Sequence, residues 1–117
     1  MRQLPRFIGM VHLPPLPGSP GSALSLAACE AHALADARAL AAGGADGLIV
    51  ENFGDAPFRR GRVDPHTVAA MTRIALRIRI GVHATRETAG VLVIGTGGGL
   101  DSGRECICVC VALLEIP

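Results

Sequence analysis

Two ionisable side chains of complementary chemistry stand at the ends of two predicted strands. His12 ends the strand expected within the apolar segment 7–13, and Glu51 ends a second strand that begins at Leu48. A carboxylate beside an imidazole favours the charged imidazolium, and such a pair can perform acid/base chemistry or hold a metal ion. We therefore predict His12 and Glu51 as catalytic residues, with hydrogen-bonded structural roles as the alternative.

Three polar or charged residues after Glu51 are candidates for binding a substrate. Asn52 follows Glu51 directly, and Asp55 and Arg59 stand in the loop that comes next. Because Arg binds phosphates in a bidentate manner, Arg59 is the predicted contact to a phosphate group. A plain turn role is the alternative for Asp55, and a solvated surface position is the alternative for Arg59. These residues identify no cofactor, and none is assigned as a metal ligand.

The elements that must position these side chains alternate between strands and helices. The apolar segments 7–13 and 48–52 have the length of buried strands, and the second is apolar on both faces until its last residues. Such a pattern is typical of a parallel strand covered on both sides. An Ala-rich helix over 24–42 joins the strands, because Ala has the highest helix propensity and Gly43 and Gly44 end the helix.

A second helix begins at Asp64 and Pro65 and runs to about residue 80. Asp64 can accept from the free N–H groups of the first turn, and Pro65 lacks an N–H that would be unpaired anyway. The order strand, helix, strand, helix predicts a parallel α/β sheet with right-handed crossovers. Ligands bind beyond the carboxyl ends of such strands, so this topology brings His12 and Glu51 to one edge.

The segment after residue 80 is less regular. Residues 90–95 are a candidate third strand, and 106–116 are a candidate strand or short helix. The glycines at 95–99 resemble a phosphate-binding loop only weakly, because the third glycine of that motif is replaced by Leu100. A C-x-C-x-C pattern puts three thiols on one face of a strand, whereas zinc sites use wider spacings. We expect small buried hydrophobes, with a soft-metal site as the alternative, at Cys106, Cys108 and Cys110.

Composition excludes several classes of function. The chain of 117 residues is 50% hydrophobic with a formal net charge of +1, which excludes disorder. No run of about 20 apolar residues could span a membrane. Trp and Tyr are absent, so aromatic platforms for stacking nucleic-acid bases are scarce, and we expect no nucleic-acid partner.

The cysteine content and the N-terminus bear on location. Nothing in the spacing of the four Cys implies a disulfide framework, which favours the reducing cytoplasm. The Arg-containing N-terminus has no acidic residue before Glu30, so a mitochondrial leader is the alternative.

Long stretches of this sequence resemble the BtpA family. The likeness lies in Ile8 to Pro14, in Leu16 to Pro20 and in the string Gly43 to Phe58, and Thr67 to Ile74 continues it. It covers residues 6–79. The string G-G-A-D-G-L-I-V-E-N-F-G-D-A-P-F is far more specific than a lone glycine motif.

The resemblance implies a (β/α)8 barrel of the ribulose-phosphate-binding type. It also implies a role in photosystem I biogenesis or stability for members from photosynthetic bacteria, while other members have no settled chemistry. Motif positions of the family at the ligand-binding rim are occupied by His12, Glu51, Asn52 and Asp55.

We predict an incomplete TIM-type barrel. A whole barrel takes about 250 residues. Residues 1–80 would form the N-terminal β/α units, and 81–117 a divergent tail with a candidate third strand, as in a truncated or spliced product. Three functions stay open: an enzyme for a small phosphorylated or nucleoside-like metabolite, a non-catalytic assembly factor, and a fragment with little activity of its own. Open sheet edges predict self-association.

Overall fold

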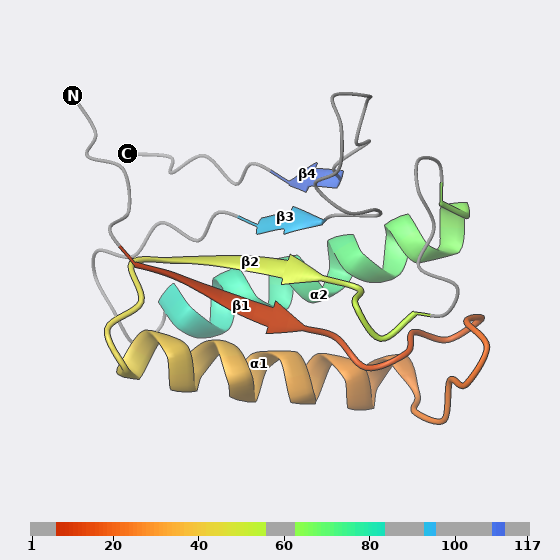
Figure 1. Ribbon diagram of the computed structural model, residues 1–117, viewed down its shortest axis with the longest axis horizontal. Coiled ribbons are helices and arrows are strands. Elements are labelled where there is room, and N and C mark those ends of the chain that lie inside the picture. The colour runs from red at the N-terminus through yellow and green to blue at the C-terminus, as the bar shows by residue number, and fades with distance from the viewer. Residues whose placement is uncertain (1–6, 56–62, 84–92, 96–108, 112–117) are drawn as a thin grey trace.

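A computed structural model describes residues 7–55, 63–83, 93–95 and 109–111. Strands and helices alternate at first, and two short strands follow (Figure 1). The elements are β1 (Ile8–His12), α1 (Leu26–Ala42), β2 (Gly47–Glu51), α2 (Pro65–His83), β3 (Val93–Gly95) and β4 (Val109–Val111). The chain is therefore an α/β protein with two consecutive β/α units, as the sequence predicts.

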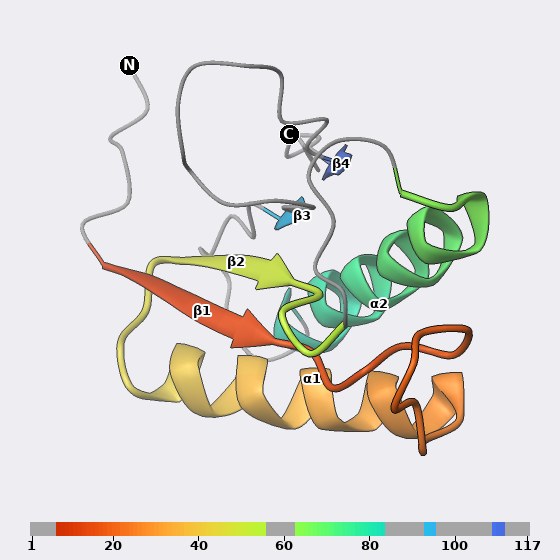
Figure 2. The same cartoon turned by 45° about the vertical axis from the view of Figure 1, so that its right-hand side comes forward.

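β1 and β2 form a parallel pair, and both helices lie along one side of it (Figures 1 and 2). The alternation of side chains along each strand separates the two faces of the pair. Val11 and Val50 are fully buried on the helical side. Ile8 and Met10 point to the opposite face, where each is 41% exposed.

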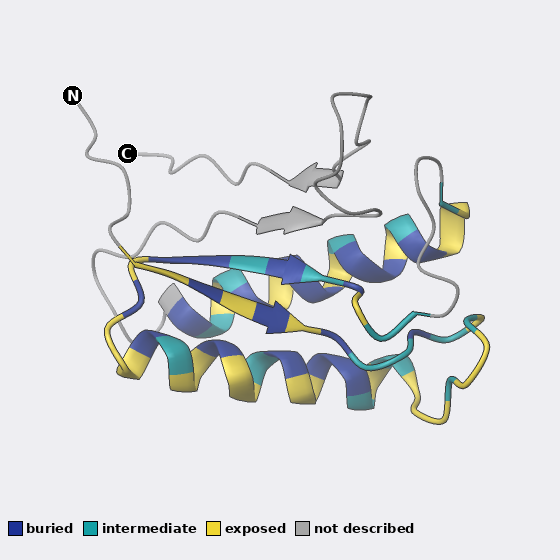
Figure 3. Cartoon of the chain, viewed as in Figure 1, coloured by how far each residue is buried: buried dark blue, intermediate teal, exposed yellow. Residues whose placement is uncertain are grey.

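The core between the sheet and the helices is aliphatic (Figure 3). Small residues on α1 let this helix approach the strands closely, and mostly larger ones on α2 fill the remaining space. The residues at these positions are Cys29, Ala33, Ala37 and Ala41 on α1 and Met71, Ile74, Ala75, Ile78 and Val82 on α2. An ion pair between the buried Glu30 carboxylate and the exposed Arg73 guanidinium also joins the helices.

The helix boundaries differ slightly from the predicted ones. α1 begins two residues later than predicted, because the Ser25 hydroxyl accepts a hydrogen bond from the N–H of Ala28 at 3.2 Å and caps the helix. α2 extends beyond Ile80 to His83, since Val82 is buried in the core and holds the last turn in place.

The two short strands make a separate antiparallel sheet. β3 pairs with β4, so that Ile94 lies opposite Cys110, and β3 runs alongside β2 on the side away from β1 (Figures 1 and 2). Strands thus form within both predicted segments. Their hydrogen-bonded partners are each other and not β2, which differs from a third parallel unit of a barrel. Cys106 and Cys108 lie outside the described residues.

Candidate functional site

The parallel register brings His12 and Glu51 together at the carboxyl ends of the strands. They are direct partners in the ladder, and Nε2 of His12 lies 3.4 Å from Oε2 of Glu51. The His12 side chain is 51% exposed and that of Glu51 is 20% exposed. The predicted proximity is therefore confirmed, and an imidazole that solvent can reach contacts a largely shielded carboxylate.

Phe53 completes this group, and the sequence analysis missed it. Its ring stacks on the His12 imidazole, with centroids 4.9 Å apart and planes inclined by 23°. The residue is nevertheless 62% exposed. An aromatic residue just after a strand end, in a chain with only three Phe, was the signal that could have revealed it.

Asp55 ties the loops after β1 and β2 together. One carboxylate oxygen accepts from the N–H of Leu16 at 2.8 Å, and the other accepts from Nδ2 of Asn52 at 2.9 Å. Gly54 adds a backbone bond, since its N–H donates to the carbonyl of Leu13 at 3.1 Å. Asp55 therefore has the turn role that was the alternative in the sequence analysis, and its carboxylate holds together the two loops that border the site.

Asn52 has an unusual environment. Only 4% of the residue is exposed, and its Oδ1 has no hydrogen-bond partner. The Asp55 carboxylate accepts and does not donate, so the amide nitrogen must face it and the oxygen is left over. A buried acceptor without a partner costs about 1–3 kcal/mol. Such a cost marks Asn52 as a candidate for function.

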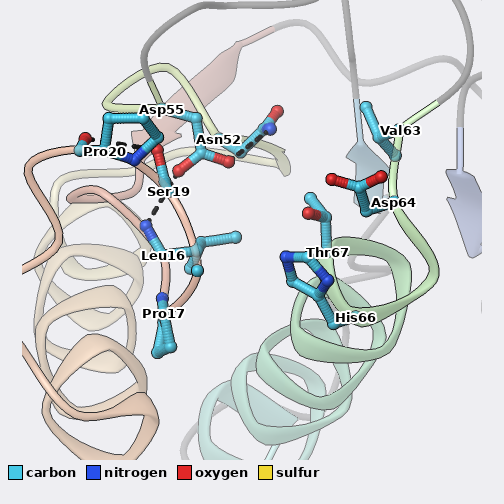
Figure 4. Close-up of a pocket in the computed structure, with 11 residues that line it drawn as sticks. Leu16, Pro17, Ser19, Pro20, Asn52, Asp55, Val63, Asp64, His66 and Thr67 are labelled. Carbon is cyan, nitrogen blue, oxygen red and sulfur yellow. Dashed lines mark hydrogen bonds between the residues drawn. The ribbon is translucent and has the colours of Figure 1, made fainter.

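A pocket of about 90 Å³ lies beside these loops, between the segment after β1 and the first turn of α2 (Figure 4). Asp55 and Asn52 belong to one wall, and Asp64, Thr67 and His66 stand across from Asp55. His66 packs against Gly18: a Cβ at this glycine, whose φ is +92°, would lie 2.6 Å from Nε2. His66, in the first turn of α2, is exposed and also lines the pocket.

The remaining candidates are placed as follows. Arg59 lies outside the described residues. Within the described part of the chain, no three His, Cys, Asp or Glu side chains gather where they could bind a metal ion. No helix there is both long and apolar enough to cross a membrane. Burial, and then the nearby charge of Asp55, raise the pKa of the Cys29 thiol, which lies near the carbonyl of Pro15.

Comparison with known proteins identifies the family. The sequence model of the BtpA family matches residues 4–97, and the chain belongs to this family. The photosystem I biogenesis protein BtpA of Synechocystis is 49% identical over 88 residues, which cover 70% of this chain and 31% of that protein. An uncharacterised protein of Archaeoglobus fulgidus is 48% identical over 88 residues, or 70% of this chain and 35% of that protein.

A eukaryotic relative is more distant. An uncharacterised Caenorhabditis elegans protein, named as mitochondrial, is 36% identical over 67 residues, or 57% of this chain and 24% of that protein. The matched part of the chain spans about a third of the length of the first two relatives. No solved structure matches the chain.

Proposed function

We propose that the chain supplies the N-terminal part of a binding site for a small phosphorylated or nucleoside-like metabolite, at the carboxyl edge of β1 and β2. The observation that carries this proposal is the contact between His12 and Glu51 at 3.4 Å, at the edge where parallel α/β sheets bind ligands. In this proposal the two β/α units within 1–80 belong to a (β/α)8-type architecture, and 81–117 form a divergent tail.

The two ionisable groups have separate roles in this proposal. His12 is exposed and transfers a proton to or from the ligand, while the Glu51 carboxylate orients the imidazole. Asn52 and Asp55 hold the loop that borders the site, and Arg59 contacts the phosphate. Support for a solvent-accessible site comes from Phe53, whose exposed ring stacks on His12.

The proposal is tested by nuclear magnetic resonance with ribose 5-phosphate, adenosine and inorganic phosphate as probes. We expect at least one organic probe to shift the amide signals of His12, Glu51 and Phe53. Glu51→Gln and His12→Gln should weaken that response, because each removes one partner of the pair. Asp36→Asn, an exposed site on α1, is the control and should respond like the parent. Unchanged binding in both His12→Gln and Glu51→Gln would contradict the proposal.

A second candidate is a non-catalytic assembly role. It is favoured by the exposure of Ile8 and Met10 on the sheet face away from the helices and by the printed name of the Synechocystis relative, a biogenesis protein. On this hypothesis the open face binds another protein surface, a second copy of the chain included. Met10→Ser should then lower self-association in sedimentation velocity, whereas Glu51→Gln should leave it unchanged.

The proposed location is the cytoplasm, with mitochondria as the alternative suggested by the name of the C. elegans relative. The observation that supports a reducing compartment is the buried free thiol of Cys29.

A further inference from the structure

We infer that the pocket between the loop after β1 and the start of α2 binds the hydroxyl-bearing part of a ligand, such as the edge of a sugar or polyol, and not an anion. This inference rests on the proposed function, since it names the part of the metabolite that the neighbouring site holds. It concerns a different set of atoms from the His12–Glu51 pair, because neither residue lines the pocket.

Carboxylates stand on both walls of the pocket (Figure 4). The carboxylates of Asp55 and Asp64 both line it, and no Lys or Arg stands among the described lining residues. Asn52 lines it as well, and its amide nitrogen donates to Asp55. Carboxylates that face each other across a pocket call for a ligand that brings donors, and every hydroxyl group is one.

The wall formed by the start of α2 also carries groups that can donate to a hydroxyl oxygen. Thr67 contributes a hydroxyl there, and His66 contributes an imidazole that packs against Gly18 (Figure 4). Each of these groups both donates and accepts in its neutral form. Adjacent hydroxyls of a sugar can therefore donate to the carboxylates of Asp55 and Asp64 and accept from Thr67 and His66.

A phosphate is the main competitor, because the N-terminus of a helix attracts anions. The first turn of α2 presents few N–H groups to an anion in this pocket. Pro65 has no N–H, and the N–H groups of Thr67 and Val68 already donate to the carbonyl of Asp64, at 3.0 and 3.3 Å. The carboxylates of Asp55 and Asp64 repel an anion as well. Charge and backbone geometry both disfavour phosphate at this pocket.

The size of the pocket limits the occupant. Its volume is about 90 Å³, below the roughly 150 Å³ of a cavity that holds benzene. The pocket therefore encloses a diol or triol edge and leaves the rest of a larger ligand outside. Asn52 connects this pocket to the end of β2, because it follows Glu51 directly.

The test is a two-dimensional NMR titration of the full chain with D-ribose, with glycerol and with inorganic phosphate. We expect D-ribose and glycerol to shift the amide signals of Leu16, Ser19 and Thr67, and phosphate to leave them unchanged. Asp64→Asn and Thr67→Val should each weaken the response to D-ribose about tenfold, the loss typical of one hydrogen bond to a ligand.

The variants are matched for folding. Asn is as good a helix N-cap as Asp, so Asp64→Asn keeps the start of α2, and Asp36→Asn changes the same charge at an exposed site outside the pocket. A parent-like response in both pocket variants would overturn the inference. So would shifts of the same amides by phosphate that grow in Asp64→Asn, or a folded parent that responds to neither D-ribose nor glycerol.

The same titrations separate this inference from the proposed function. One outcome is that D-ribose shifts the pocket signals while the organic probes bind Glu51→Gln and His12→Gln as they bind the parent. This outcome would support the pocket and contradict the acid/base site. Probe shifts confined to His12, Glu51 and Phe53 would support that site and contradict the pocket.

Discussion

The two faces of the β1–β2 pair differ in how completely they are covered. On the helical side, Val11 and Val50 are fully buried together with Ile74 and Ile78 of α2. On the other side, Ile8 and Met10 remain 41% exposed and share the face with His12. The first face accounts for the stability of the two units, because burial of apolar area is the main favourable contribution to folding. The second face leaves polar and apolar groups accessible for binding.

The sharpest test of this difference is a pair of identical truncations. Ile74→Ala removes a fully buried side chain and should lower the free energy of unfolding by about 4 kcal/mol. Ile8→Ala removes one that is 41% exposed and should cost less than about 1 kcal/mol. Urea unfolding followed by circular dichroism measures both, since the chain has no Trp or Tyr for fluorescence. Equal losses would show that the second face is also covered in solution.

A glycine substitution tests the loops at the carboxyl edge. A Cβ at Gly54 would lie 2.6 Å from the carbonyl oxygen of Leu13 and 2.8 Å from the nitrogen of Pro15. Since both are backbone atoms, the loops after β1 and β2 must separate, and Gly54→Ala should cost about 3 kcal/mol. It should also shift the amide signals of Leu16 and Asn52.

The control for this substitution is Gly21→Ala. Gly21 has a φ of +82° but nothing within 4 Å of the added Cβ, so only the left-handed backbone opposes the change, at about 1–2 kcal/mol. A Gly54→Ala variant no less stable than Gly21→Ala would contradict the close approach of the two loops.

The stability of the chain at alkaline pH tests the helical side of the β1–β2 pair, where Cys29 is buried. Burial raises the pKa of this thiol above the ordinary 9.0, so above that pH the unfolded chain loses a proton that the folded chain retains. Below pH 9.0 this thiol should therefore have no effect on the pH dependence of stability. As the pH rises further, the free energy of unfolding should fall. Neither Lys nor Tyr is present, so the four Cys thiols are the side chains that titrate in this range. Urea unfolding at several pH values measures this fall, and Cys29→Ala should reduce it. An unchanged slope in Cys29→Ala would assign the fall to other groups.

The smallest expected effect belongs to the candidate catalytic pair. His12→Gln removes a half-exposed partner of Glu51, and exposed ion pairs contribute at most about 1 kcal/mol. Thermal unfolding by circular dichroism should show almost no change. Loss of ligand binding in this variant would then reflect the site and not the fold, whereas a large destabilisation would assign His12 a structural role.

Local patterns were enough to predict much of this architecture. The apolar runs, the Ala-rich segment and the Asp64-Pro65 start predicted both parallel strands and both helices, with errors of a few residues at the ends. The resemblance to the BtpA family is confirmed by the match over 4–97. These features depend on residues near one another in the chain, and a sequence displays such neighbours directly.

Contacts between distant positions could not be predicted in the same way. Asp55 accepts from Leu16, Arg73 pairs with Glu30, and His66 packs against Gly18. In isolation each of these residues is typical of an ordinary turn or a solvated helix, so their roles stayed open. The single exception was the meeting of His12 and Glu51, because the alignment of parallel strands follows from the order of the elements.

By itself, the sequence determined which segments become strands and helices, their parallel order and the edge at which polar side chains gather. Propensity, capping and hydrophobic periodicity act over a few residues, so they can be recognised without coordinates. The tertiary structure alone decided which buried groups find partners. It left Oδ1 of Asn52 without one and built a pocket from two loops and a helix end, because these depend on the relative placement of elements that are remote in the chain.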